Sequence, residues 1–215
     1  MNKDIRRKRT ESYFIDALCD IIRHEGMGAA TIRNVAEKAG YNSATIYTYF
    51  SNFSHLLLKA HFVFELELLE KIKVDTNLEI NENMCQIWAS AYISMTDYYL
   101  ENPNIFECIF VSLYQDGIPG ELRNAHNEQS QFIQFVNNFL ERISIETGVQ
   151  IQTIKQLHQT CLSLTVGTVL LHIKERCSLP KEEVLSTLTN QVKFLIEGQM
   201  SMERGERKCG LESED

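Results

Sequence analysis

The chain of 215 residues contains only three prolines, at positions 103, 119 and 180, and apolar residues recur at helical spacing almost throughout. No segment alternates apolar and polar residues as a half-buried β-strand would. Long hydrophobic runs are also missing. The longest uncharged apolar stretch, 161–173, includes Ser163 and Thr165 and is too short and too polar to span a bilayer. We therefore expect an all-α protein without a membrane span.

The usual signatures of catalysis and metal binding are absent as well. There is no G-x-S-x-G, P-loop, Rossmann glycine pattern or H-E-x-x-H, and the histidines lack convincing catalytic partners. The six cysteines form no C-x-x-C pair, as is usual for thiols in a reducing compartment. His158 and Cys161 share a helical face, but two ligands do not make a metal site. We expect no enzyme activity, cofactor or metal.

Charge is unevenly distributed along the chain. The net charge is −8, yet residues 1–50 hold eight basic and six acidic side chains, whereas the remainder holds 13 basic and 23 acidic ones. DNA affinity comes largely from cations that meet phosphates, so the front of the chain is the DNA-facing part. The basic residues at 3–9 are not followed by an apolar segment, which argues against a secretory signal and places the protein in the cytoplasm.

The apolar pattern predicts about nine helices, bounded by caps and breakers. We expect helices at 5–25, from Thr31 to Gly40, through Phe50, from Ser51 to about 74, and at 80–101. Pro103 suits the opening of the next helix, and 117–120 reads as a loop. Further helices are expected at 121–146, 151–177 and 181–202.

Residues 31–50 have the pattern of a helix-turn-helix: a short helix, a glycine turn at Gly40 and a second short helix. Ile46 and Phe50 lie four apart on the buried side of the second helix. The remaining residues of that helix are of a size and polarity suited to a DNA groove.

This run, TIRNVAEKAGYNSATIYTYF, resembles the tetR family of repressors, whose pattern is T-I-x-x-I-A-x-x-A-G-V-S-x-G-T-I-Y-x-Y-F. The resemblance covers about 60 residues. It implies a dimer that binds palindromic double-stranded operator DNA, with a divergent helical ligand domain behind the three-helix reading head. The DNA-contacting positions that it implies are Thr31, Arg33, Asn42, Ser43, Ala44, Thr45, Tyr47 and Tyr49.

The chain departs from the family pattern in two places, of which Ala44 should still allow close approach to DNA and Phe53 removes one expected phosphate contact. Ala44 stands where glycine is usual, and Phe53 and Ser54 stand where lysine and glutamate are common at the start of the fourth helix. The basic arm at 3–9 is expected to supply part of the missing positive charge.

The last two helices are expected to form the homodimer interface. Six residues of helix 151–177 make a heptad-like seam, and helix 181–202 adds a second apolar stripe. The seam consists of Ile154, Leu157, Cys161, Leu164, Thr168 and Leu171. A single thick core within one subunit is the alternative, because periodicity does not distinguish a partner helix from a neighbouring one.

Two aromatic stripes are expected to line a cavity for an unidentified small effector, apolar or aromatic, and His172 is expected to add a polar contact. The stripe residues are Trp88, Tyr92, Met95 and Tyr99, then Phe106, Phe110 and Tyr114. Plain core packing is the alternative for these side chains. We place a DNA-binding domain at 1–50, with the start of the fourth helix to about 60, a regulatory and dimerisation domain at 51–203, and a frayed tail at 204–215. The predicted function is a repressor released by its effector; a regulator controlled by a protein partner is the alternative.

Overall fold

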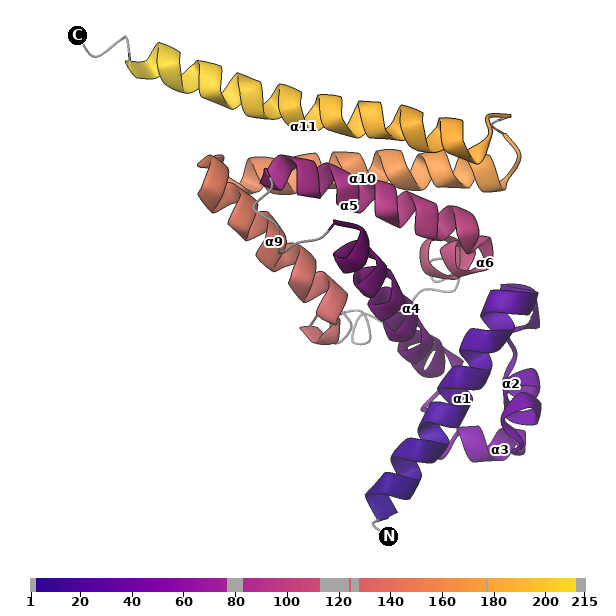
Figure 1. Cartoon of the computed structure of the whole chain (residues 1–215). Helices are drawn as coiled ribbons and strands as arrows, with labels where there is room; N and C mark the ends of the chain where they lie inside the picture. The colour runs from indigo at the N-terminus through magenta and orange to yellow at the C-terminus, as the bar shows by residue number, and fades with distance from the viewer. Residues whose placement is uncertain (1–2, 77–82, 113–123, 125–127, 177, 212–215) are drawn as a thin grey trace. The chain divides into compact units, whose positions relative to one another are not determined.

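The computed structural model describes residues 3–76, 83–112, 124, 128–176 and 178–211, and helices are the regular secondary structure of these residues (Figure 1). The prediction of an all-α protein with about nine helices is confirmed, since nine α-helices lie in these ranges. Within the same ranges, no helix is long and apolar enough to cross a membrane. In chain order the elements are α1 (Lys3–Glu25), η1 (Met27–Ala29), α2 (Ile32–Ala39), α3 (Ser43–Ile46), α4 (Phe53–Thr76), α5 (Met84–Glu101), α6 (Pro103–Phe106), the π-helix η2 (Glu107–Ser112), α9 (Gln131–Thr147), α10 (Ile151–Ile173) and α11 (Lys181–Leu211).

Three of the expected boundaries are wrong. α9 begins at Gln131 rather than 121, because Ser130 is not helical and its buried hydroxyl donates a hydrogen bond of 2.7 Å to Glu65 Oε2. α10 ends at Ile173, and Glu175 beyond it has a positive φ of 53°. α11 continues to Leu211, so the segment expected to fray from 204 is helical up to that residue. The predicted loop at 117–120 lies outside the described residues.

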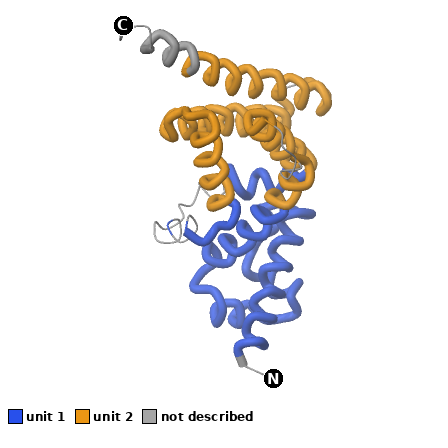
Figure 2. The backbone as a smooth tube through the Cα atoms, turned by 60° about the vertical axis from the view of Figure 1, so that its left-hand side comes forward, with its two compact units in different colours: residues 1–67, 102–132 blue, residues 68–101, 133–215 orange. Residues whose placement is uncertain are grey.

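The chain divides into two compact units (Figure 2), of which unit 1 comprises residues 1–67 and 102–132. Its core is built on one face of α1, where Phe14, Leu18 and Ile22 are fully buried. The C-terminal end of α1 is held from two sides. Asn104 Nδ2 donates to the Arg23 carbonyl oxygen at 3.0 Å, and Arg23 Nη2 donates to both carboxylate oxygens of Glu67 at 2.8 and 3.1 Å. Asn104 thereby satisfies one of the carbonyls that a helix end leaves open.

Unit 2 comprises residues 68–101 and 133–215, and in it α5, α10 and α11 pack against one another (Figure 1). On α10, Ile154, Leu157 and Cys161 of the predicted seam are buried. Leu171 of the same seam is 52% exposed, and Thr165 and Val169 outside the seam are buried. Lys181 joins α11 to α5 by ion pairs of 2.7 Å to Asp97 and 2.9 Å to Glu101. The buried residues of α11 are spaced four apart: Val184, Leu188, Val192, Ile196 and Met200.

Candidate nucleic-acid interface

Side chain to backbone hydrogen bonds fix where α2 begins. Thr31 has an extended conformation, and its hydroxyl oxygen accepts a hydrogen bond of 3.2 Å from the backbone N–H of Asn34. This is the N-cap arrangement that threonine favours. Val35 and Ala36 then face the core and are almost fully buried. Thr31 and Arg33 remain exposed on the outer side of the helix.

The turn after α2 depends on Gly40, which has a φ of +79° and a ψ of +27°. In this left-handed conformation its N–H donates to the carbonyls of Ala36 and Glu37, and Tyr41 N–H donates to Ala36 O at 2.9 Å. The left-handed region is costly for residues that carry a Cβ atom. Glycine therefore allows the chain to leave α2 and enter α3 after three residues, at the predicted glycine turn.

Asn42 caps α3, the predicted recognition helix. Asn42 Oδ1 accepts hydrogen bonds from Thr45 N–H at 2.9 Å and from the Thr45 hydroxyl at 3.0 Å. The α-helical part is shorter than predicted, since it ends at Ile46 and continues to Phe50 as hydrogen-bonded turns. Ile46 and Phe50 are buried, as expected.

The structure brings the predicted DNA-contacting residues together on the outer surface of α2 and α3 in unit 1. Among them Tyr47 is the large side chain with the most exposure, at 58%. Four others are exposed, and three are half-buried. The exposed ones are Thr31, Arg33, Asn42 and Ala44, and the half-buried ones are Ser43, Thr45 and Tyr49. The set is polar and small apart from its tyrosines, which is the composition of a surface that enters a groove.

Tyr49 differs from Tyr47 because it packs against the chain itself. Its ring centroid lies 5.7 Å from that of Phe14, and the Arg7 guanidinium carbon lies 5.4 Å from the Tyr49 ring centroid. Arg7 Nη2 also donates to the Thr48 carbonyl oxygen at 3.4 Å. These contacts indicate that Tyr49 helps to hold the recognition element in place.

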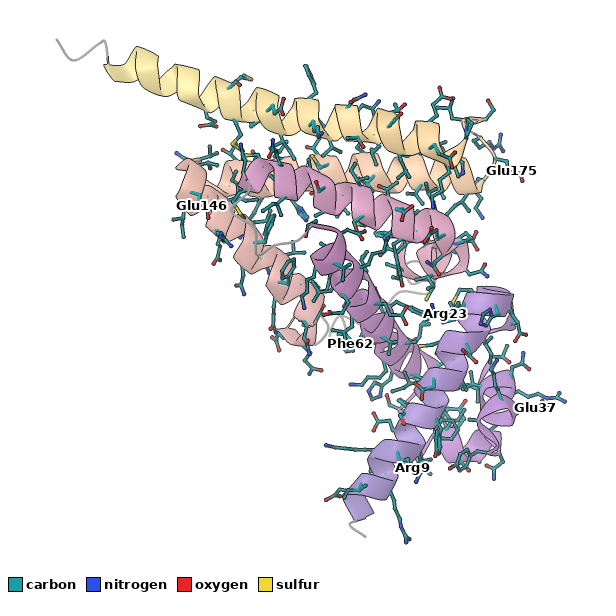
Figure 3. The ribbon with its side chains drawn as sticks, in the orientation of Figure 1. Arg9, Arg23, Glu37, Phe62, Glu146 and Glu175 are labelled. Atoms are coloured by element: carbon teal, nitrogen blue, oxygen red, sulfur yellow. The ribbon has the colours of Figure 1, made fainter. Side chains whose placement is uncertain are left out.

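The basic segment at the front of the chain is helical rather than an extended arm, since α1 begins at Lys3. Arg6, Arg7, Lys8 and Arg9 are exposed on the first turns of α1, where Figure 3 labels Arg9. Because Arg7 contacts residues that follow α3, these cations lie beside the recognition element. The sequence identified the charge, but only the structure shows this proximity.

Sequence reasoning missed the residues that begin α4. Asn52 Oδ1 accepts a 2.8 Å hydrogen bond from His55 N–H, so Asn52 provides the cap. The His55 ring lies edge-on to Phe50, with centroids 5.6 Å apart. Burial and the nearby Lys59 lower the pKa of His55, which keeps its imidazole neutral at pH 7. His55 therefore does not replace the positive charge that Phe53 lacks. An asparagine three residues before His55 is the capping signal that could have been recognised.

The candidate effector residues on α5 are buried within unit 2. Trp88, Tyr92, Met95 and Tyr99 each have no more than 6% of their surface exposed. The Tyr92 hydroxyl lies 2.6 Å from His158 Nδ1 and donates to the His158 carbonyl oxygen at 3.1 Å. Burial raises the pKa of Tyr92 and lowers the pKa of His158, so both groups are neutral at pH 7.

The second aromatic stripe belongs to unit 1, where Phe106 is fully buried and its ring centroid lies 5.1 Å from that of Phe110. Tyr114 lies outside the described residues. His172 is on α10 in unit 2, and its Nδ1 atom is buried without a hydrogen-bond partner, as is the hydroxyl oxygen of Thr165. The described residues contain no group of three His, Cys, Asp or Glu side chains placed to hold a metal ion.

A capped short helix, a left-handed glycine turn and a second helix with a polar outer face together define a helix-turn-helix DNA-binding domain. Residues 14–60, which contain these elements, match the family model described as bacterial regulatory proteins, tetR family. Residues 14–60 therefore form a DNA-binding domain of the tetR type. No curated protein sequence matches it.

Solved structures share the fold at low sequence identity. The fatty acid degradation regulator FadR from Bacillus halodurans has 18% identity and a TM-score of 0.63, covering 88% of this chain and 95% of that one. FadR from Bacillus subtilis, in complex with stearoyl-CoA, has 20% identity and a TM-score of 0.63, covering 87% and 98%. A tetR-family protein from Vibrio parahaemolyticus has 17% identity and a TM-score of 0.60, covering 83% and 96%. These likenesses show the fold alone.

Proposed function

We propose that the protein is a dimeric repressor that binds a palindromic operator through α2 and α3 and leaves it when a small apolar effector binds. The observation that carries the DNA-binding part is the outer surface of residues 42–49, where Asn42, Tyr47 and Thr48 are exposed. Ile46 and Phe50 are buried and supply the packing. Packing alone does not require exposed polar residues there. The DNA contacts are assigned to Thr31, Arg33, Asn42, Ser43, Ala44, Thr45 and Tyr47, with Tyr49 in a supporting position.

Dimerisation is assigned to α10 and α11. Leu171, Phe194 and Met202 are 52%, 76% and 64% exposed, although most large apolar residues of unit 2 are buried. Large exposed apolar side chains on neighbouring helices favour burial against a second copy of the chain. A two-fold axis would place two recognition helices about 34–36 Å apart, which matches successive major grooves.

The effector is assigned to the interior of unit 2. Buried polar atoms are nearly always hydrogen-bonded, so the unpartnered Thr165 hydroxyl and His172 Nδ1 favour a bound polar group beside α10. The buried aromatic residues Trp88, Tyr92 and Tyr99 of α5 favour an apolar body for the same ligand. Stearoyl-CoA, present in the Bacillus subtilis FadR structure, is the first probe to test.

The mechanism is a coupling between two binding events. An effector that binds the DNA-free form more tightly lowers operator affinity, and by linkage DNA weakens effector binding by the same factor. A coupling of about 1–3 kcal/mol corresponds to about 5–150-fold.

The test begins with selection of bound fragments from the genomic DNA of the source cell, followed by fluorescence anisotropy on the enriched duplex. We expect saturable binding to a palindrome, which Tyr47→Ala weakens and Asn138→Ala, an exposed change on α9, leaves unchanged. Stearoyl-CoA and free stearate are then titrated into the complex. Operator affinity that no apolar ligand alters would favour control by a protein partner.

A further inference from the structure

The side-chain oxygen of Asn42 already accepts two hydrogen bonds from within the protein. The atom of Asn42 that faces Thr45 N–H at 2.9 Å must be the carbonyl oxygen, because a backbone N–H is an obligatory donor. The same oxygen accepts the Thr45 hydroxyl at 3.0 Å. Both lone pairs of Oδ1 are therefore used within the protein, and only the two N–H groups of Nδ2 can face a ligand.

This commitment restricts which bases Asn42 can read. Asparagine recognises adenine by accepting from N6–H with its oxygen while donating to N7 with its nitrogen. The first half of that pair is not available here. A side chain that can only donate is complementary to base atoms that only accept, which in the major groove are N7 of both purines, O6 of guanine and O4 of thymine.

The neighbouring side chains distinguish thymine from the two purines. Thr45 donates its hydroxyl proton to Asn42, so it presents acceptor lone pairs and a methyl group rather than a donor. Ala44 is exposed beside it and presents a second methyl group. Methyl groups on a reading surface pack favourably on the 5-methyl group of thymine, which both purines lack.

Building on the proposed DNA-binding function, we propose that Asn42, Ala44 and Thr45 form a thymine-reading surface, in which Asn42 Nδ2 donates to O4 and the two methyl groups cover the 5-methyl group. Asn42 is then a specificity-determining residue as well as a helix cap. Each half-site therefore contains a thymine opposite this surface, and the protein does not select adenine at that position.

The first experiment selects bound duplexes from a random pool and then replaces each enriched thymine in turn. Uracil removes the 5-methyl group and keeps O4, whereas 5-methylcytosine keeps the methyl group and puts an N4–H donor where O4 was. We expect one thymine per half-site at which uracil lowers affinity about fourfold, the value of one buried methyl group. At the same thymine, 5-methylcytosine should lower affinity about tenfold.

Two protein variants test whether Asn42 and Thr45 are the residues that contact that thymine. Thr45→Ser keeps the hydroxyl that bonds Asn42 and removes the methyl group, so it should remove most of the difference between thymine and uracil. Asn42→Asp keeps the capping oxygen but replaces the donor with an acceptor, so it should reverse the preference to cytosine, whose N4–H donates. Helical content and melting temperature are measured for each variant, so that a change in base recognition is distinguished from a loss of folded protein.

Other outcomes overturn the proposal. If Asn42→Asp weakens every duplex by the same factor, Asn42 donates to phosphate and reads no base. If uracil has no effect on the wild type at any thymine, the methyl contacts do not exist. If selection enriches no duplex at all, the DNA-binding function itself fails, which is a different result from enrichment without this thymine.

Discussion

Tyr47 and Tyr49 are two residues apart, yet Tyr47 is exposed and Tyr49 packs against other side chains of the domain. Tyr47 is 58% exposed, so Tyr47→Ala should change the free energy of unfolding by no more than about 0.5 kcal/mol, as is usual for surface positions. Tyr49 packs on Phe14 and lies under the Arg7 guanidinium. Loss of an aromatic pair and an exposed cation–π contact should cost Tyr49→Ala about 1–2 kcal/mol.

The effect on DNA binding should be the reverse of the effect on stability. A hydrogen bond from Tyr47 to a phosphate is worth at least about 1.5 kcal/mol, so Tyr47→Ala should weaken operator binding about tenfold per half-site. Tyr49→Ala should weaken binding mainly under conditions in which the variant domain begins to unfold. Tyr47→Phe serves as the control that keeps the ring and removes the hydroxyl.

Urea unfolding followed by circular dichroism gives the stability of each variant, and fluorescence anisotropy with the enriched operator gives its affinity. The reasoning would be refuted by Tyr47→Ala with unchanged affinity at moderate salt. It would equally be refuted by Tyr49→Ala with wild-type stability, because the contacts to Phe14 and Arg7 would then contribute nothing.

Three further predictions concern the turn, pH and assembly. Gly40→Ala should destabilise the protein by about 1 kcal/mol because of its φ of +79°, whereas Gly28→Ala, where an added Cβ meets nothing within 4 Å and φ is ordinary, should be neutral or slightly stabilising in thermal melts. Burial lowers the pKa of His158 below its ordinary 6.5, so the unfolded chain binds a proton first and stability should fall as the pH drops below about 6.5; His158→Gln should flatten that slope in urea titrations at several pH values. Phe194→Glu should dissociate the dimer in sedimentation velocity with helical content unchanged, and an intact dimer would place the interface elsewhere.

The helix-turn-helix was predictable because its signals are local. Thr31 and Gly40 act on backbone groups within a few residues, so the sequence that carries them also determines where α2 begins and ends. The burial of Ile46 and Phe50 followed from their spacing alone. For the same reason, the polar outer surface of α3 could be named before its geometry was known.

The structure differs from the sequence-based predictions at positions whose conformation depends on residues far away in the chain. Ser130 interrupts the expected helix because its hydroxyl bonds Glu65, a partner 65 positions earlier that no local pattern reveals. The apolar pattern of α10 also does not reveal which residues meet the subunit's own core. Thr165 and Val169 are buried there, whereas Leu171 is 52% exposed. The support that Tyr49 receives from Arg7 likewise joins residues far apart in the chain.

Phe14 touches three aromatic rings at once, those of Tyr41, Tyr49 and Phe50, with centroids 5.0, 5.7 and 6.4 Å away. α3 itself is a single turn, too short to be stable alone, and it takes its rigidity from α1 through this ring. Apart from the capping residue Asn42 and its partner Thr45, the side chains that face outward from α3 contribute little to the free energy of folding. Operator preference can therefore change by single substitutions at these positions while the reading head keeps its shape, so descendants of one such protein can acquire new target genes without first acquiring a new fold.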